Sequence, residues 1–143
     1  MPEIRWFHDR SRLIVEAAIL PPVGAPNEST VIKVNALLDT GATTSGVVPK
    51  TAHALGLQSM GKKPVQTAGG LIQSDRFAFR LGFYKQARDD RLAFPHVLGR
   101  TIFGIGLAES DSFEIIVGMD VIGRNHLELR PDGQSLFRFD TSS

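Results

Sequence analysis

The chain has 143 residues, of which 42% are hydrophobic and 22% charged, a composition typical of a globular protein and not of a disordered one. Sixteen Lys and Arg against fifteen Asp and Glu give a formal net charge of +1, so the bulk charge indicates neither a nucleic-acid-binding surface nor a basic membrane patch. The absence of cysteine excludes disulfides and thiolate chemistry.

The N-terminal stretch and the longest apolar runs determine the expected location. MPEIRWFHDR is mixed and charged, unlike a signal peptide, and no run approaches the roughly 20 apolar residues of a membrane-spanning helix. We therefore expect a cytoplasmic protein with neither a membrane nor a nucleic acid as partner. The sequence has no evident linker, repeat or low-complexity tract, which predicts one domain over residues 1–143.

Most apolar segments are short, rich in Val, Ile, Leu and Phe, and separated by Gly, Pro, Asn or Asp, as in strands joined by turns. The sequence therefore predicts a mainly β protein. In chain order the predicted strands cover residues 12–20, 29–38, 45–49, 63–68, 71–83, 94–103, 113–118, 126–130 and 135–140. Residues 21–29 are predicted to form a turn-rich loop, and residues 85–91 a charged turn.

Two short helices are predicted among the strands. The first covers PKTAHALGL, opening at Pro49 and closing near Gly56, because proline fits the first helical turn and glycine the end of a helix. The second runs for a turn or two after Gly118, and we expect Asp120 to cap the run VIGRN.

An aspartate at the end of an apolar strand is the main candidate for chemistry. Residues 36–46 read ALLDTGATTSG, so the strand VIKVNALL leads directly into Asp39. Two carboxyls that share one proton can activate a water and protonate a leaving nitrogen, and both desolvation and a like-charged neighbour favour the singly protonated pair. The alternative interpretation is a turn aspartate bonded to its own backbone.

Two later segments of the sequence are read together with the DTG tripeptide. TAGG, residues 67–70, begins about 30 residues after Asp39, and IIVGMDVI begins about 80 residues after it. The order of LLDTGATT, TAGG and IIVGMDVI resembles the retropepsin-like aspartic proteases, in their bacterial and cellular branch. The resemblance covers about residues 30–130. It implies an acid-protease fold with a closed, barrel-like sheet, a flap hairpin and one or two short helices.

The resemblance implies one catalytic residue in each chain and three groups of supporting residues. The catalytic residue is Asp39. Three residues support the active-site loop, namely Thr40, Gly41 and Ala42. The flap tip, which binds substrate, consists of Ala68, Gly69 and Gly70. Gly118 and Asp120 belong to a structural strand-helix motif.

The single DTG motif predicts a homodimer. Asp120 is followed by Val121 and lacks the Thr-Gly turn of a catalytic loop, so a helix cap or an acid bonded to backbone is its favoured interpretation. We expect two chains to pair about a two-fold axis, each contributing its Asp39, as the resemblance also implies. The resemblance further implies a reciprocal contact of the Thr40 hydroxyls.

Aromatic residues near both ends of the chain have two open interpretations. Trp6 and Phe7, and likewise Phe137 and Phe139, belong either to the core or to terminal strands that pair across the dimer. The resemblance allows the second interpretation, because chain termini often contribute to the interface in that family.

Two functions from different classes fit these patterns. The first is an aspartic endopeptidase that hydrolyses extended polypeptides in a groove between the Asp39 dyad and the flaps. The second is a catalytically silent dimeric β module that binds extended peptides in the same groove. The complete DTGA motif favours the first, because a binding module does not require closely paired acids.

No cofactor is expected for either function. The four histidines are far apart in sequence and show no metal-binding spacing. GRTIFGIG, residues 99–106, lacks the Gly-Lys-Ser/Thr ending of a phosphate loop, so no nucleotide site is expected there.

Overall fold

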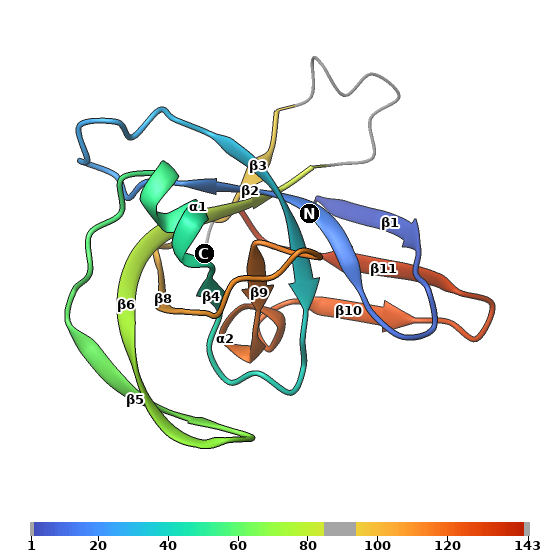
Figure 1. Ribbon diagram of the computed structural model, residues 1–143. Coiled ribbons are helices and arrows are strands. Elements are labelled where there is room, and N and C mark those ends of the chain that lie inside the picture. The colour runs from blue at the N-terminus through green and yellow to red at the C-terminus, as the bar shows by residue number, and fades with distance from the viewer. Residues whose placement is uncertain (1, 85–93, 142–143) are drawn as a thin grey trace.

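The computed structural model describes residues 2–84 and 94–141 (Figure 1). The strands are β1 (Glu3–Phe7), β2 (Ile14–Leu20), β3 (Ile32–Leu38), β4 (Gly46–Val47), β5 (Lys62–Thr67), β6 (Gly70–Phe83), β7 (His96–Val97), β8 (Ile102–Gly106), β9 (Ile115–Val117), β10 (His126–Leu129) and β11 (Gln134–Arg138). The helices are α1 (Pro49–Ala54) and α2 (Met119–Ile122). The prediction of a mainly β protein is confirmed, whereas the turn predicted at 85–91 lies outside the described residues.

The larger sheet closes on itself. Its strands follow the order β2-β3-β9-β4-β8-β6-β5, and β2 also pairs with β6, which completes a ring. The interior is filled by alternate residues of these strands, since successive side chains of a strand point to opposite faces. Phe77, Phe79, Leu81 and Phe83 of β6 are all buried in this way. The predicted barrel-like sheet is confirmed.

A second sheet of three strands has the order β1-β11-β10 and joins the two ends of the chain. Phe137 and Phe139 are fully buried, and their rings lie 5.2 and 5.0 Å from the ring of Phe83 in the larger sheet. These two residues are therefore core residues. β1 pairs with β11 of the same chain, and Phe7 at its end is 75% exposed.

The single strand predicted over residues 94–103 is wrong, because the structure divides it into β7 and β8. Both strands pair with β6, but the register shifts by two residues between them, from Gly82 opposite Val97 to Phe79 opposite Ile102. The extra residues bend the chain between β7 and β8, as a bulge does in an antiparallel pair.

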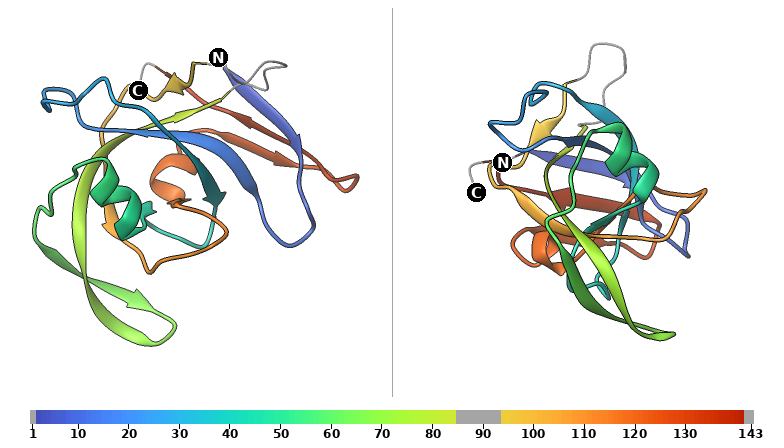
Figure 2. Two further views of the ribbon diagram at one scale, coloured as in Figure 1. Left: turned by 45° about the horizontal axis from the view of Figure 1, so that its top comes forward. Right: turned by 60° about the vertical axis from the view of Figure 1, so that its left-hand side comes forward.

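The helix that opens at Pro49 begins where the sequence predicted, with proline in its first turn, and Gly56 beyond its end has φ of +70°. The described residues contain no helix long and apolar enough to cross a membrane. The β5–β6 hairpin extends away from the body of the protein, as both views of Figure 2 show.

Candidate active site

Asp39 directly follows β3, at the point where β3 lies beside β9. β9 is parallel to β3 and antiparallel to β4, so it lies between the two strands that precede and follow the DTG loop. The Asp39 amide donates a hydrogen bond of 2.9 Å to the carbonyl of Val117, the last residue of β9. The position of Asp39 is therefore fixed by the backbone of a segment almost 80 residues away in the sequence.

The DTG loop is a tight turn around the Asp39 carboxyl. The carbonyl of Asp39 accepts the amide of Ala42 at 3.1 Å, and its side-chain Oδ1 accepts the amide of Gly41 at 2.9 Å. A Cβ on Gly41 would lie 3.2 Å from that Oδ1, so glycine lets the backbone approach the acid closely. A bond from its own loop is also what a simple turn aspartate would have, and by itself it does not identify a catalytic acid.

Ala42 and Gly118 connect the DTG loop to the start of α2. The Met119 amide donates to the Ala42 carbonyl at 2.7 Å. A Cβ added to Gly118 would lie 2.8 Å from this same carbonyl oxygen and 2.9 Å from the carbonyl carbon of Thr44, so only glycine fits there without displacing backbone.

Asp120 is held by the second half of the DTG segment. Its Oδ1 accepts hydrogen bonds from the amide and the hydroxyl of Ser45, at 3.1 and 2.7 Å, and the Ser45 hydroxyl oxygen accepts the Gly118 amide at 3.0 Å. Asp120 does not cap α2, because the N-cap position is Gly118 and Asp120 lies within the first turn. The predicted cap is wrong, whereas the other interpretation, an acid bonded to backbone, is confirmed by the bond from the Ser45 amide.

Ser45 is a site residue that the sequence analysis did not identify. It is fully buried, and its hydroxyl joins the DTG segment to α2 through Gly118 and Asp120. A serine after two threonines has no local pattern that would indicate such a role.

The predicted flap residues lie in the turn of the β5–β6 hairpin. Ala68 and Gly69 form a two-residue loop between the paired residues Thr67 and Gly70, and Gly70 has φ of +111°. The Thr67 hydroxyl donates to the Gly70 carbonyl at 2.8 Å and accepts the Gly69 amide at 3.2 Å. Thr67 thus fixes the turn; the sequence placed it in the TAGG segment but indicated no role for its hydroxyl.

Two grooves lie on either side of the DTG loop. The first, which we call the hairpin groove, has a volume of about 350 Å³ and runs between loop residues 41–44 and residues 63–66 of β5. Ile105, Leu107 and Ile116 complete its wall. It therefore separates the DTG loop from the hairpin by a largely apolar space.

The second groove, which we call the Asp39 groove, has a volume of about 390 Å³. Asp39 and Thr40 form one wall, and residues 8–13, the loop between β1 and β2, form another. In Figure 1 and the left view of Figure 2, this β1–β2 loop and the β5–β6 hairpin lie on opposite sides of the DTG loop.

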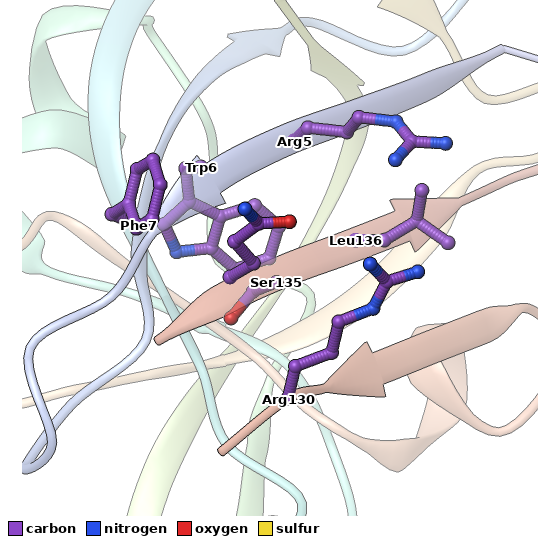
Figure 3. A pocket seen from close by; sticks show the side chains of 7 residues that line it. Arg5, Trp6, Phe7, Arg130, Ser135 and Leu136 are labelled. Atoms are coloured by element: carbon purple, nitrogen blue, oxygen red, sulfur yellow. The ribbon is translucent and has the colours of Figure 1, made fainter. Parts of the chain in front are cut away.

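A smaller pocket of about 200 Å³ lies on the three-stranded sheet, between Trp6, Phe7 and Leu136 (Figure 3). Two arginines border it, but Arg5 pairs with Glu3 and Arg130 with Glu128. None of the predicted site residues lines it. The described part of the chain contains no cluster of three or more His, Asp or Glu placed to hold a metal ion.

Comparisons with known proteins identify a family and similar folds. A family model described as aspartyl protease matches residues 27–121. The fold is similar to a crystal structure of a retropepsin-like aspartic protease from Rickettsia conorii, with a TM-score of 0.60 and 18% identity, over 96% of this chain and 91% of that one. A solution structure of the simian foamy virus (mac) protease is also similar, with a TM-score of 0.41 and 20% identity, over 76% of this chain and 89% of that one. A comparison with curated proteins gave no match.

Proposed function

Since the chain belongs to the aspartyl protease family and has a retropepsin-like fold, as its motifs predicted, we propose that it is an aspartic endopeptidase that works as a homodimer. Each protomer contributes its Asp39 to a dyad on a two-fold axis. The observation that carries the proposal is the position of Asp39, whose carboxyl follows a buried strand, is held in a loop bonded to β9, and borders an open groove.

The chemistry follows from two carboxyls that share one proton. The ionised carboxyl removes a proton from a water, which adds to the carbonyl carbon of the peptide, while the protonated carboxyl donates to the carbonyl oxygen. Collapse of this intermediate breaks the C–N bond, and the nitrogen leaves with a proton from the dyad. The bond from the Gly41 amide to Oδ1 holds the carboxyl of its own Asp39 in place.

A second chain is needed because Asp120, the other acid beside the DTG loop, has a supporting role. Asp120 uses Oδ1 to hold both polar groups of Ser45, and its position within α2 makes it part of the support of the loop. The dyad is therefore completed by the Asp39 of a partner. Thr40 is exposed in the single chain, so its side chain is free to contact a partner protomer.

The substrate is an extended peptide that lies in the hairpin groove and continues past the DTG loop to Asp39, between the dyad and the flap. β5 is the last strand in the sheet order and pairs with β6, so among the described residues its other edge is open to an added strand. The wall formed by Val65, Ile105 and Leu107 favours an apolar side chain of the peptide. The Ala68–Gly69 turn would then act as the tip of a flap over it.

The test compares wild type with Asp39→Asn on an unfolded protein between about pH 4 and 7, where a coupled carboxyl pair is expected to work. Asp111→Asn, at an exposed position that lines none of the grooves described above, is the matched control. We expect wild type and Asp111→Asn to cleave and Asp39→Asn to be inactive. Equal cleavage by all three would contradict the proposal, and peptide binding without any cleavage would indicate the silent binding module instead.

Sedimentation provides a second, independent measurement. We expect a dimer of 2 × 15.6 kDa that persists in Asp39→Asn, since the substitution removes charge and keeps the shape of the side chain. A protein that stays monomeric with and without peptide would exclude the shared dyad even if the fold is right.

A further inference from the structure

The Asp39 groove contains two arginines whose positions are set by the loop that carries them. Arg10 and Arg12 belong to the β1–β2 loop, residues 8–13, and both line the groove that Asp39 and Thr40 border. We propose that these arginines bind an acidic side chain of the substrate peptide, close to the cleaved bond. The inference rests on the proposed function and assigns a substrate class to it.

The loop is anchored at both ends. At its start, the His8 amide donates to the Gly133 carbonyl at 3.0 Å, and the His8 ring contacts the Ser135 hydroxyl on β11. At its end, the Leu13 carbonyl accepts the amide of Leu38 at 2.8 Å, one residue before Asp39. The backbone that carries the arginines between these anchors therefore keeps a fixed place relative to the acid.

Asp9 stabilises the interior of the loop by hydrogen bonds. Its Oδ1 accepts three hydrogen bonds, from the Ser11 amide at 2.8 Å, the Ser11 hydroxyl at 2.6 Å and the Arg12 amide at 2.7 Å. These bonds, first of all that from the Ser11 hydroxyl, lower the pKa of Asp9 from 3.8 to about 2. The carboxyl therefore stays ionised, and the turn stays formed, over the whole range in which an aspartic dyad is expected to work.

Neither guanidinium lies within ion-pair distance of a carboxylate in residues 2–84 and 94–141, although the charge of Arg12 also contributes to the lowered pKa of Asp9. The nearby arginines of the three-stranded sheet differ in this respect, because Arg5 and Arg138 pair with Glu3, and Arg130 pairs with Glu128. Arg10 donates only a long bond of 3.4 Å to the Pro131 carbonyl. Two unpaired guanidiniums beside one groove favour a carboxylate, which their planar donor groups bind in pairs.

The rest of the groove suits the carbon chain of such a residue. Leu13, Leu37 and Leu129 form its apolar part, and Leu129 is 52% exposed. A glutamate has two methylene groups for these leucines and a carboxylate for the arginines. The combination favours Glu in the peptide over an apolar or a basic residue.

The first experiment measures binding and does not depend on cleavage. Asp39→Asn protein is immobilised at about pH 6, where free Glu is ionised, and two pools of random peptides of about ten residues are passed over it. The pools differ only in having Glu or Gln as a permitted residue. We expect the Glu pool to be retained about fivefold more, the scale of an exposed ion pair, and the preference to vanish when Arg10→Gln and Arg12→Gln are added.

Charge reversal separates recognition from a structural effect. Arg10→Glu with Arg12→Glu is expected to retain Lys-containing peptides in place of Glu-containing ones, which damage to the fold would not produce. If that variant does not fold, the Gln variants provide the same comparison. Lys50→Gln with Arg124→Gln, which removes two positive charges outside the groove, is the matched control and should keep the preference for Glu.

The outcomes separate this inference from the proposed function. Equal retention of the Glu and Gln pools, or retention of neither, overturns the acidic specificity whether or not the protein cleaves. Loss of the dimer in the Gln variants, with equal retention of both pools, assigns the arginines to the contact between protomers and also overturns it. If the Glu pool binds better but wild type cleaves nothing, the acidic specificity of the Asp39 groove is supported and only the proposed endopeptidase activity is overturned.

Discussion

The carboxylate of Asp120 accepts two hydrogen bonds from Ser45, at 3.1 Å from the amide and at 2.7 Å from the hydroxyl, although 75 residues separate them. This pair ties the segment that follows the DTG loop to the first turn of α2. The loop that positions Asp39 is thus bonded to the β9–α2 segment on both sides, at Val117 before the turn and at Asp120 after it.

Ser45→Ala should destabilise the fold. The substitution removes the hydroxyl that donates to Asp120 and accepts from the Gly118 amide, and it leaves a buried amide without its acceptor. We expect a loss of about 1–3 kcal/mol in the free energy of unfolding, measured with urea. Ser29→Ala, at an exposed loop position, is the control, and a similar small effect of both substitutions would contradict the role of Ser45.

Gly118→Ala should be poorly tolerated. The new Cβ would meet two backbone atoms of the DTG segment at 2.8 and 2.9 Å, and neither can move without displacing the loop. We expect destabilisation of about 1–3 kcal/mol, typical of overpacking, and a lower activity. Gly69→Ala is the matched control because its Cβ would find no atom nearer than 3.8 Å, so its melting temperature should stay that of wild type.

Thr67→Val should alter the hairpin tip without unfolding the protein. Valine keeps the shape of threonine but loses the bonds to the Gly70 carbonyl and the Gly69 amide. If the hairpin acts as a flap, a looser tip lowers kcat/KM by roughly three- to tenfold while the melting temperature stays within about 2 °C. Thr30→Val, the same substitution outside the hairpin, serves as the control and should leave kcat/KM unchanged. An unchanged kcat/KM in Thr67→Val would argue that this turn does not contact substrate.

Asp9→Asn should remove one source of acid sensitivity. Because the folded pKa of Asp9 is lowered to about 2, its ionised carboxyl stabilises the fold above its ordinary value of 3.8, and this contribution is lost as pH falls toward 2. We expect the urea midpoint of Asp9→Asn to lie below that of wild type at about pH 5 and to converge with it near pH 2. A constant difference between the two proteins over this range would show that the carboxyl charge is not involved.

Much of the fold could be predicted from the sequence because strand signals are local. Val34 and Ala36 alternate with Lys33 and Asn35 in β3, and apolar residues alternate along the second half of β6, from Phe77 to Phe83. β1 was not among the predicted strands, and a terminal strand at Trp6 and Phe7 was only one of two open interpretations, with its pairing expected across the dimer instead of with β11 of the same chain. It is an edge strand with charged residues on one face, and its pairing with β11 lies at the far end of the chain.

Local patterns are enough to place an acid, Asp39, at the end of an apolar strand in a Gly-containing turn, because strand alternation and turn chemistry act over a few residues. Which groups meet there depends on the folded chain. Ser45 meets Asp120, the Asp39 amide meets Val117, and the arginines of the β1–β2 loop line the groove beside Asp39. These contacts join segments tens of residues apart, and their register depends on how β9 inserts between β3 and β4. No local pattern carries that information, since a side chain such as that of Ser45 has the same local preferences wherever the chain places it.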